Sequence, residues 1–198
     1  MDRDQLREAW DTVAETYAHN RDPSGSDADL IDDLLATLPA DPKILDIGPC
    51  DGARTLANLP AGSVGVDISR DALELARETV PESVLLQGDM ASLPIVGGSM
   101  DGITAYHAVF HVPRAEHPAV YEEFARVLRP GGRLLMTLPG GRFETTRRGW
   151  MGGSMFFSAP GREQALTQLE EAGFEDVQTE MADDPLGSST EFVFATRS

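Results

Sequence analysis

Cysteine, lysine and histidine are scarce in this chain of 198 residues, which has one Cys, one Lys and four His. A single Cys excludes an internal disulfide and a zinc site built from several thiolates. The few His residues add little material for a metal centre, so we expect no metal. No apolar run reaches the roughly 20 residues that span a bilayer, and the first residues lack the apolar stretch of a signal peptide. We therefore expect a cytoplasmic protein without membrane contact.

Positive charge is also scarce, because 33 Asp and Glu stand against 16 Lys and Arg, a net charge of −17. Nucleic-acid affinity comes largely from neutralising phosphates, so this balance predicts no nucleic-acid partner. Self-repulsion of this size should also destabilise the folded state at low salt. The near-absence of Lys resembles proteins of salt-in halophilic archaea. An ordinary acidic bacterial protein is the alternative.

The order of predicted elements indicates the fold class. At 198 residues and 41% hydrophobic content, the chain is of single-domain size, which we place at 1–198. We expect strands and helices to alternate and then to give way to a Gly-rich loop, a helix and two closing strands. The ranges are strands near 43–47, 63–67, 83–87, 101–107 and 132–138, helices near 52–59, 69–80 and 115–128, the loop at 139–158, the last helix at 160–172, and closing strands within 174–180 and 190–197. This order predicts an α/β fold with a doubly wound, mostly parallel sheet.

Two further helices are predicted before the first strand, near 5–18 and 27–38. The first carries Leu6, Trp10, Val13 and Tyr17 at helical spacing. Because they precede the sheet, we expect residues 1–39 to form a helical cap over a core at 40–198.

The run ILDIGPCDG at 44–52 predicts a ligand-binding turn. A buried strand breaks there into a Gly-rich loop, where Gly48 and Gly52 would let the backbone approach a ligand. The N-terminus of the predicted next helix would favour an anionic group. Asp67 lies 19 residues after Gly48 at the end of the next strand, where a carboxylate can bind a ribose diol. Together these features predict a nucleoside site.

The identity of the nucleoside depends on the loop residues. A dinucleotide fingerprint fits only in part, with Gly48, Cys50 and Ala53 at its three positions. Asp46, two residues before the first Gly, better suits a ligand with an amino group.

Five features, in order along the chain, resemble the class I S-adenosylmethionine (SAM)-dependent methyltransferases. They are the Asp46–Gly48–Gly52 loop, Asp67, the GDM of 88–90, and the segments SMDGITAYHAVFHV (99–112) and VLRPGGRLLMTLP (127–139). Cys50 departs from this pattern, since it replaces the middle Gly. The resemblance covers roughly 40–197 and implies a seven-stranded sheet whose last strand is antiparallel, with SAM as the cofactor.

The resemblance also implies residue roles. The cofactor-binding positions would be Asp46, Gly48, Cys50, Gly52, Asp67, Ile68, Asp89, Met90 and His107. The loop would hold the methionine part, Asp67 the ribose hydroxyls, and Ile68, Asp89 and Met90 the adenine.

Other residues are candidates for catalysis and acceptor binding. His107 and His111 could act as general bases; alternatively, His107 offers only its backbone carbonyl and His111 packs. Tyr17 could close over the sulfonium. Arg142, Arg147 and Arg148 could bind a carboxylate or phosphate on the acceptor, or pair with surface acids.

These observations favour a methyltransferase that acts on a small-molecule acceptor, with the hypothesis that the acceptor is anionic. An NAD(P)-dependent oxidoreductase and a non-catalytic SAM-binding protein remain as alternatives. The sequence does not indicate an oligomeric state.

Overall fold

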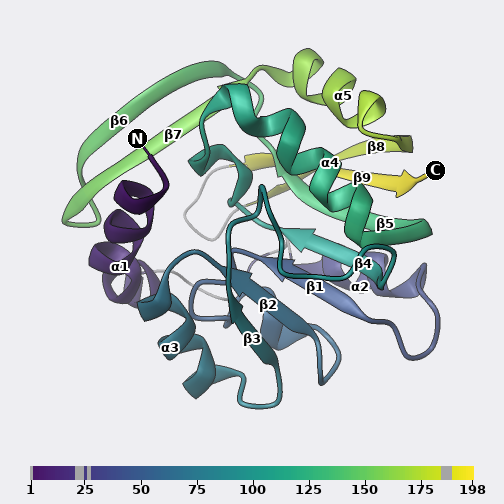
Figure 1. Cartoon of the computed structure of the whole chain (residues 1–198), viewed down its shortest axis with the longest axis horizontal. Helices are drawn as coiled ribbons and strands as arrows, with labels where there is room; N and C mark the ends of the chain where they lie inside the picture. Colours follow the sequence, from purple (N-terminus) through teal and green to yellow (C-terminus); the bar gives the residue numbers. More distant parts are fainter. Residues whose placement is uncertain (1, 21–24, 26–27, 184–188) are drawn as a thin grey trace.

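The computed structural model describes residues 2–20, 25, 28–183 and 189–198. It contains helices, short 3-10 turns (η) and strands in alternation (Figure 1). Their bounds are α1 Arg3–Asn20, α2 Asp29–Ala36, β1 Ile44–Ile47, η2 Leu56–Asn58, β2 Val64–Asp67, α3 Arg70–Thr79, β3 Val84–Gln87, β4 Met100–Ala105, η3 Val109–His111, η4 Arg114–Glu116, α4 His117–Val127, β5 Leu128–Leu138, β6 Arg142–Trp150, β7 Gly153–Pro160, α5 Arg162–Glu171, β8 Phe174–Asp183 and β9 Ser189–Arg197.

The main sheet has seven strands in the order β3-β2-β1-β4-β5-β9-β8. Strands β1 to β5 pair in parallel, whereas β9 is antiparallel to both of its neighbours. The arrows of β4 and β9 accordingly point in opposite directions, with β4 directed toward α1 (Figure 1). The predicted doubly wound, mostly parallel sheet with an antiparallel last strand is confirmed.

Helices cover both faces of this sheet, because neighbouring strand residues point to opposite sides. Leu45 and Leu134 belong to the cluster that includes buried residues of α4 and α5. Ile44 and Leu135 belong to the cluster that includes α2 and the end of α3. Helix α2 therefore packs on the sheet, and of the expected cap at 1–39 only α1 lies at the carboxyl ends of the strands.

The helix predicted at 52–59 is wrong. The segment forms turns and the single 3-10 turn η2. Pro60 closes the segment only eight positions after Gly52, which has φ +75°. The Thr55 hydroxyl donates to the buried carboxylate of Asp46, an alternative bond that competes with helical structure. The predicted helix N-terminus for an anion is therefore absent from this segment.

The Gly-rich loop predicted at 139–158 is also wrong, because most of it forms the two-stranded hairpin β6–β7. Trp150 pairs with Gly153, and the two residues between them, Met151 and Gly152, have φ of +49° and +86°. Positive φ at both positions is the signature of a type I′ hairpin turn. The glycines here make the turn of a hairpin.

The hairpin tip rests on α1, as Figure 1 shows at the left of the molecule. A Cβ on Gly153 would lie 2.6 Å from a methyl group of Val13, so only Gly permits this approach. Leu6, Val13 and Tyr17 of α1 are buried as predicted, and Trp10 is half-buried. Together, α1 and the hairpin close the carboxyl end of the sheet.

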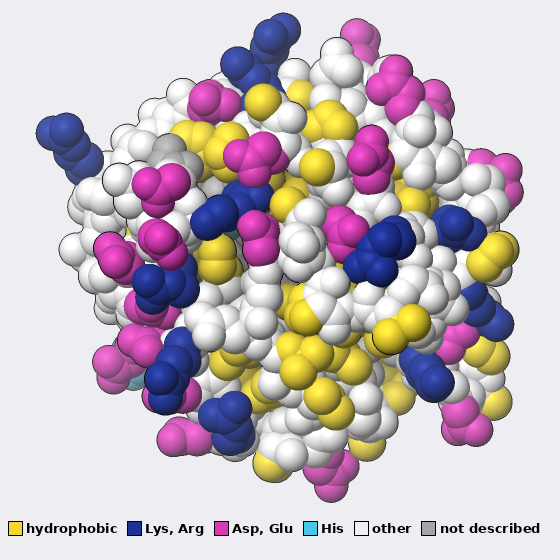
Figure 2. Space-filling view, in the orientation of Figure 1, with side chains coloured by type: hydrophobic (Ala, Val, Ile, Leu, Met, Phe, Trp, Pro, Cys, Tyr) yellow, Lys and Arg dark blue, Asp and Glu magenta, His cyan; other side chains and the backbone are white. Residues whose placement is uncertain are grey.

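Charged side chains are dispersed over the surface. On the face shown in Figure 2, Arg and Lys stand apart from one another, with Asp and Glu between them. Over the described ranges, no helix combines the length and the apolar character needed to cross a membrane.

Candidate functional site

A narrow cavity lies between α1 and the carboxyl ends of β1, β2 and β4. It is lined by residues from α1 and from the segments after these strands, namely Leu6, Trp10, Tyr17, Gly48, Cys50, Val66, Asp67, Ile68, Gly88, Asp89, Met90, Tyr106, His107, Ala108, His111 and Val112. Its volume is about 50 Å³, well below the roughly 300–1,000 Å³ of ordinary ligand pockets. A nucleoside would therefore enter only after α1 moves outward.

Asp67, at the end of β2, lines this cavity with its carboxylate held in place. Its Oδ1 accepts from the backbone N–H of Ser69 at 2.9 Å, and its Oδ2 accepts from that of Cys50 at 3.2 Å. Burial raises the pKa of Asp67 to about 6, although these N–H groups favour the ionised form. The carboxylate keeps lone pairs for a ligand hydroxyl, as the ribose role requires.

Asp46 lies beneath the loop and does not line the cavity. It is fully buried, and its two oxygens accept from the hydroxyls of Thr55 and, at 2.7 Å, Thr104. The register of β1 and β4 places Asp46 directly beside Thr104. Burial raises the pKa of Asp46 to about 6. In this structure Asp46 anchors the loop.

The glycines of the loop serve protein packing. A Cβ on Gly48 would lie 2.9 Å from that of Ala108, and one on Gly52 would lie 2.9 Å from a methyl group of Val80. Both have positive φ, and so does Cys50 at +53°. Gly48 and Cys50 line the cavity, whereas Gly52 faces α3. The loop thus holds three positions in the left-handed region, one of them without glycine.

Asp89 reaches the cavity rim together with Ile68 and Met90. Its Oδ2 accepts from Arg3 Nε at 2.6 Å, and its Oδ1 accepts from the Ala91 backbone N–H at 2.9 Å. Arg3 also donates to Glu116 at 2.5 Å. No local sequence signal marks Arg3, because its contact with Asp89 joins positions 86 residues apart.

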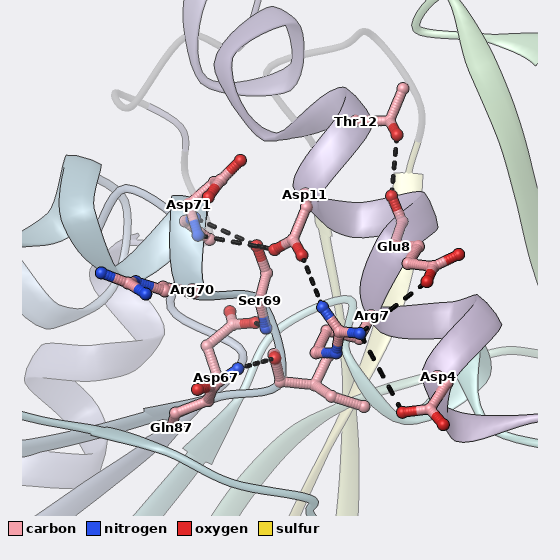
Figure 3. Close-up of polar contacts among 12 residues, drawn as sticks. Asp4, Arg7, Glu8, Asp11, Thr12, Asp67, Ser69, Arg70, Asp71 and Gln87 are labelled. Atoms are coloured by element: carbon pink, nitrogen blue, oxygen red, sulfur yellow. Dashed lines mark hydrogen bonds and ion pairs between the residues drawn. The ribbon is translucent and has the colours of Figure 1, made fainter.

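A second polar contact joins α1 to the Asp67 loop (Figure 3). Ser69 caps α3 by accepting from the Ala72 N–H at 3.0 Å. Its hydroxyl also donates to Asp11 Oδ1 at 2.7 Å. Arg7 holds the other Asp11 oxygen at 3.2 Å. Asp11 was missed by the sequence reasoning, because only the docking of α1 gives it a role.

Aromatic rings enclose the cavity on the α1 side. Trp10 makes edge contacts with Tyr17, His111 and Trp150, at centroid distances of 5.5, 4.9 and 5.9 Å. Tyr17 is 8% exposed and lines the cavity. These electron-rich faces suit a cation such as a sulfonium.

The two candidate bases differ in their surroundings. His111 is buried, and its Nδ1 lies 2.9 Å from the Phe156 carbonyl. A carbonyl only accepts, so Nδ1 carries the proton and Nε2 keeps a lone pair. Burial lowers the pKa of His111 to about 4, which keeps the ring neutral at pH 7. His107 adopts φ +53°, and its backbone N–H donates to the Thr137 hydroxyl at 2.9 Å.

His107 also borders a second, more open cavity of about 490 Å³. Arg147 lines this second cavity, with its Cζ 4.8 Å from the Phe157 ring centroid. Arg142 and Arg148 are exposed and do not line it. The structure therefore separates the three arginines and brings only Arg147 toward His107.

Within the described residues, no group of three His, Cys, Asp or Glu side chains is placed to hold a metal ion.

Comparison with known proteins shows what the segment that carries this geometry is similar to. Residues 45–136, which contain the loop, Asp67, Asp89 and His107, match the model of the methyltransferase domain. Residues 45–136 are thus similar to a methyltransferase domain. The domain runs from β1 into β5, and so includes every strand end that borders the cavity.

Two curated relatives illustrate the range of similarity to this methyltransferase domain. The 27-O-demethylrifamycin SV methyltransferase of Amycolatopsis mediterranei is 30% identical over 168 residues, covering 76% of this chain and 61% of that protein. The tRNA (carboxymethyluridine(34)-5-O)-methyltransferase alkbh8 of Xenopus tropicalis is 26% identical over 137 residues. The match covers 69% of this chain and 21% of that protein. The chain spans only 25 to 36% of the length of the first curated relatives that it matches.

Solved structures show the same fold. The magnesium protoporphyrin IX methyltransferase of Synechocystis PCC 6803, with bound SAH, superposes with a TM-score of 0.74 at 19% identity, covering all of both chains. The chain thus has the Rossmann-like fold of the class I SAM-dependent methyltransferases.

Proposed function

We propose that this protein transfers a methyl group from SAM to a small-molecule acceptor by in-line displacement. The observation that carries the proposal is the pair of cavities that meet at His107. The narrower one contains Asp67, and its lining residues outside α1 belong to the segment that matches a methyltransferase domain. The wider one gives an acceptor its own place on the other side of His107.

The residues of the narrower cavity suit the cofactor. Asp67 would hold the ribose hydroxyls, Ile68 and Met90 would flank the adenine, and Trp10 and Tyr17 would face the sulfonium. Asp89 would accept from the adenine amino group, in which case it exchanges or shares its bond to Arg3. Asp46 would act indirectly, by fixing the loop of Gly48 and Cys50.

SAM, when bound, supplies an activated methyl group and a neutral leaving group. The chain must then orient the acceptor on the transfer axis and exclude water. Helix α1 and the hairpin β6–β7 would exclude water because they close the carboxyl end of the sheet. Where the nucleophile must lose a proton, His107 or the neutral His111 would accept it.

A small acceptor fits better than a nucleic acid. A net charge of −17 opposes the phosphate contacts that nucleic-acid binding requires. The name of the rifamycin relative describes a small-molecule acceptor, whereas that of the Xenopus relative describes tRNA. Arg147 in the wider cavity supports the hypothesis that the acceptor is anionic.

The proposal includes the conditions under which the enzyme works. The excess of acids over bases and the single Lys favour a halophilic cytoplasm. Salt at about 1 M, where the Debye length is about 3 Å, would screen most of the surface repulsion.

Titration calorimetry with SAM and with NAD tests the cofactor. We expect SAM to bind and NAD not to bind, and we expect Asp67→Ala to weaken SAM binding at least tenfold, because charge-assisted bonds to the ribose are lost. The exposed Asp71 lies outside the cavity, so Asp71→Ala serves as the matched control and should keep the wild-type affinity. Binding of NAD alone would replace the proposal with the oxidoreductase alternative.

Methyl transfer is tested with labelled SAM and a panel of acceptors. Tight binding of SAM without turnover on any acceptor would favour the non-catalytic alternative. Unchanged SAM affinity in Asp67→Ala would refute the assignment of the cofactor site.

A further inference from the structure

The wall of the wider cavity is a row of aromatic rings that begins at His107. The rings of His107 and Phe110 lie 5.9 Å apart between centroids, and Phe110 stacks on Phe157 at 5.9 Å with an interplanar angle of 25°. Phe143 lines the same cavity. Such a wall favours a flat, apolar ligand, because aromatic faces stack in offset arrangements at these distances. Phe110 and Phe157 also contact the ring of His111, which lines the narrower cavity, at centroid distances of 4.7 and 4.8 Å.

Arg147 stands at the far end of this row. Its Cζ lies 4.8 Å from the centroid of the Phe157 ring. Among the residues that the structure describes, no acidic side chain forms an ion pair with Arg147. A guanidinium in this position can bind a carboxylate through two parallel N–H···O bonds.

The acidic residue of the cavity is already neutralised. Glu191 lines the wider cavity, but both of its carboxylate oxygens accept from Arg162 Nε, at 3.0 and 2.9 Å, and Nη2 donates to one of them at 2.8 Å. Arg162 holds the pKa of Glu191 below its ordinary value, so the pair stays ionised and balanced at neutral pH. Of the described residues that line this cavity, Arg147 alone then carries a charge without a balancing partner.

The geometry of β6 explains why Arg147 lines this cavity and the neighbouring Arg148 does not. Alternate residues of β6 share a face, so Phe143 and Arg147 lie on one side. Their partners in the register, Ala159 and Met155, lie on the same side of β7 as Phe157. Arg148 lies on the opposite side. It is therefore a matched control for Arg147, because both are exposed arginines of β6.

We infer that the acceptor is a flat, apolar molecule that carries one anionic group at the end away from the methylated atom. Its body packs against the aromatic wall of the wider cavity, its reactive atom lies beside His107, and its anion pairs with Arg147. This inference rests on the proposed function, since it assigns the reactive end by the junction with the SAM cavity.

Binding of three probes tests the inference, measured by calorimetry with S-adenosylhomocysteine present and KCl held constant. The probes are a hydroxynaphthoate with its hydroxyl and carboxylate at opposite ends, the matching carboxamide, and a single-ring hydroxybenzoate. We expect the naphthoate to bind at least tenfold more tightly than either of the others. Arg147→Gln should abolish the preference for the carboxylate over the carboxamide, whereas Arg148→Gln should preserve it.

Equal binding of naphthoate and carboxamide to the wild type would overturn the inference, and so would absence of binding by all three probes. Loss of the preference in Arg148→Gln as well as in Arg147→Gln would also overturn it. SAM affinity is measured separately on each variant and should not change. If SAM binds and the probes fail, only the acceptor inference falls, whereas failure of SAM binding removes the proposed function.

Discussion

At the scale of single residues, the protein contains buried titratable groups whose pKa values move in opposite directions: Asp67 lines the narrower cavity, and His117 begins α4. Burial raises the pKa of Asp67 from 3.8 to about 6 and lowers the pKa of His117 from 6.5 to about 4. The neutral form of Asp67 is therefore favoured by folding, and so is the neutral form of His117. Both shifts affect how stability depends on pH.

Between pH 4 and 6, the contributions of these two groups to stability change in opposite directions with pH. Because the folded pKa of Asp67 is raised, its contribution is fully present below 3.8 and is lost as the pH rises through about 6. Because the folded pKa of His117 is lowered, its contribution is present above 6.5 and is lost as the pH falls through about 4. Each amounts to about 3 kcal/mol at about 1.4 kcal/mol per pKa unit, so they largely cancel in the wild type.

Substitution should reveal each contribution by itself. We expect the free energy of unfolding of Asp67→Asn to fall more steeply than that of the wild type as the pH drops from 7 to 4, by about 3 kcal/mol over that interval. His117→Gln should show a shallower fall or a rise. Urea unfolding at constant KCl, followed by circular dichroism, measures both, with Asp71→Asn as the exposed control. Parallel pH profiles for Asp67→Asn and the wild type would contradict the burial effect.

At the scale of elements, α1 controls access to the narrower cavity. Its side chains Leu6, Trp10 and Tyr17 form one wall. Polar contacts hold it in place, among them those from Arg3 to Asp89 and from Ser69 to Asp11. Since the enclosed volume is about 50 Å³, we expect α1 to open before SAM associates and to close after it.

Weakening the second contact should therefore favour opening. Asp11→Ala removes the acceptor for the Ser69 hydroxyl and for Arg7. A partly exposed hydrogen bond contributes about 1 kcal/mol, which corresponds to a roughly fivefold larger opening constant. We expect faster amide hydrogen exchange in α1 and faster SAM association in stopped-flow measurements. Glu15→Ala, an exposed change on the same helix, is the control, and an unchanged exchange rate in Asp11→Ala would argue against the role of this contact.

At the scale of the whole molecule, the charge balance governs stability. The excess of 33 acids over 16 bases leaves many Asp and Glu without a partner, and the basic side chains visible in Figure 2 lie singly among them. Surface ion pairs contribute little to stability, so they do not offset the repulsion. Screening by salt should relieve it.

The melting temperature should therefore rise as KCl increases from 0.1 to 2 M, values chosen because the Debye length falls from about 10 Å to below about 3 Å over that range. Glu170 and Glu171 lie exposed at the C-terminal end of α5, where the helix dipole also disfavours negative charge. Glu170→Gln with Glu171→Gln should raise the low-salt melting temperature and reduce the effect of KCl. A melting temperature that stays flat or falls with KCl would count against the halophile proposal.

The sequence by itself predicted the sheet and the position of the narrower cavity. Alternating strands and helices have local signatures, since burial and side-chain period follow from neighbouring residues. Parallel strands bring their carboxyl ends to one edge, so Asp46, Asp67, Asp89 and His107 were predicted to converge. The last three line one cavity, whereas Asp46 does not. Glycine content misled at 139–158, because a type I′ hairpin turn also uses glycine.

Only the tertiary structure decided which side chains face a ligand and which face the protein. Asp46 follows the motif, yet its partners are Thr55 and Thr104, which the strand register and the turn after β1 bring to it. Arg147 and Arg148 are adjacent in sequence, yet strand alternation places only Arg147 in the wider cavity. Such contacts join residues far apart in the chain, and they depend on how α1 and the hairpin pack. No local pattern of residue types encodes that packing.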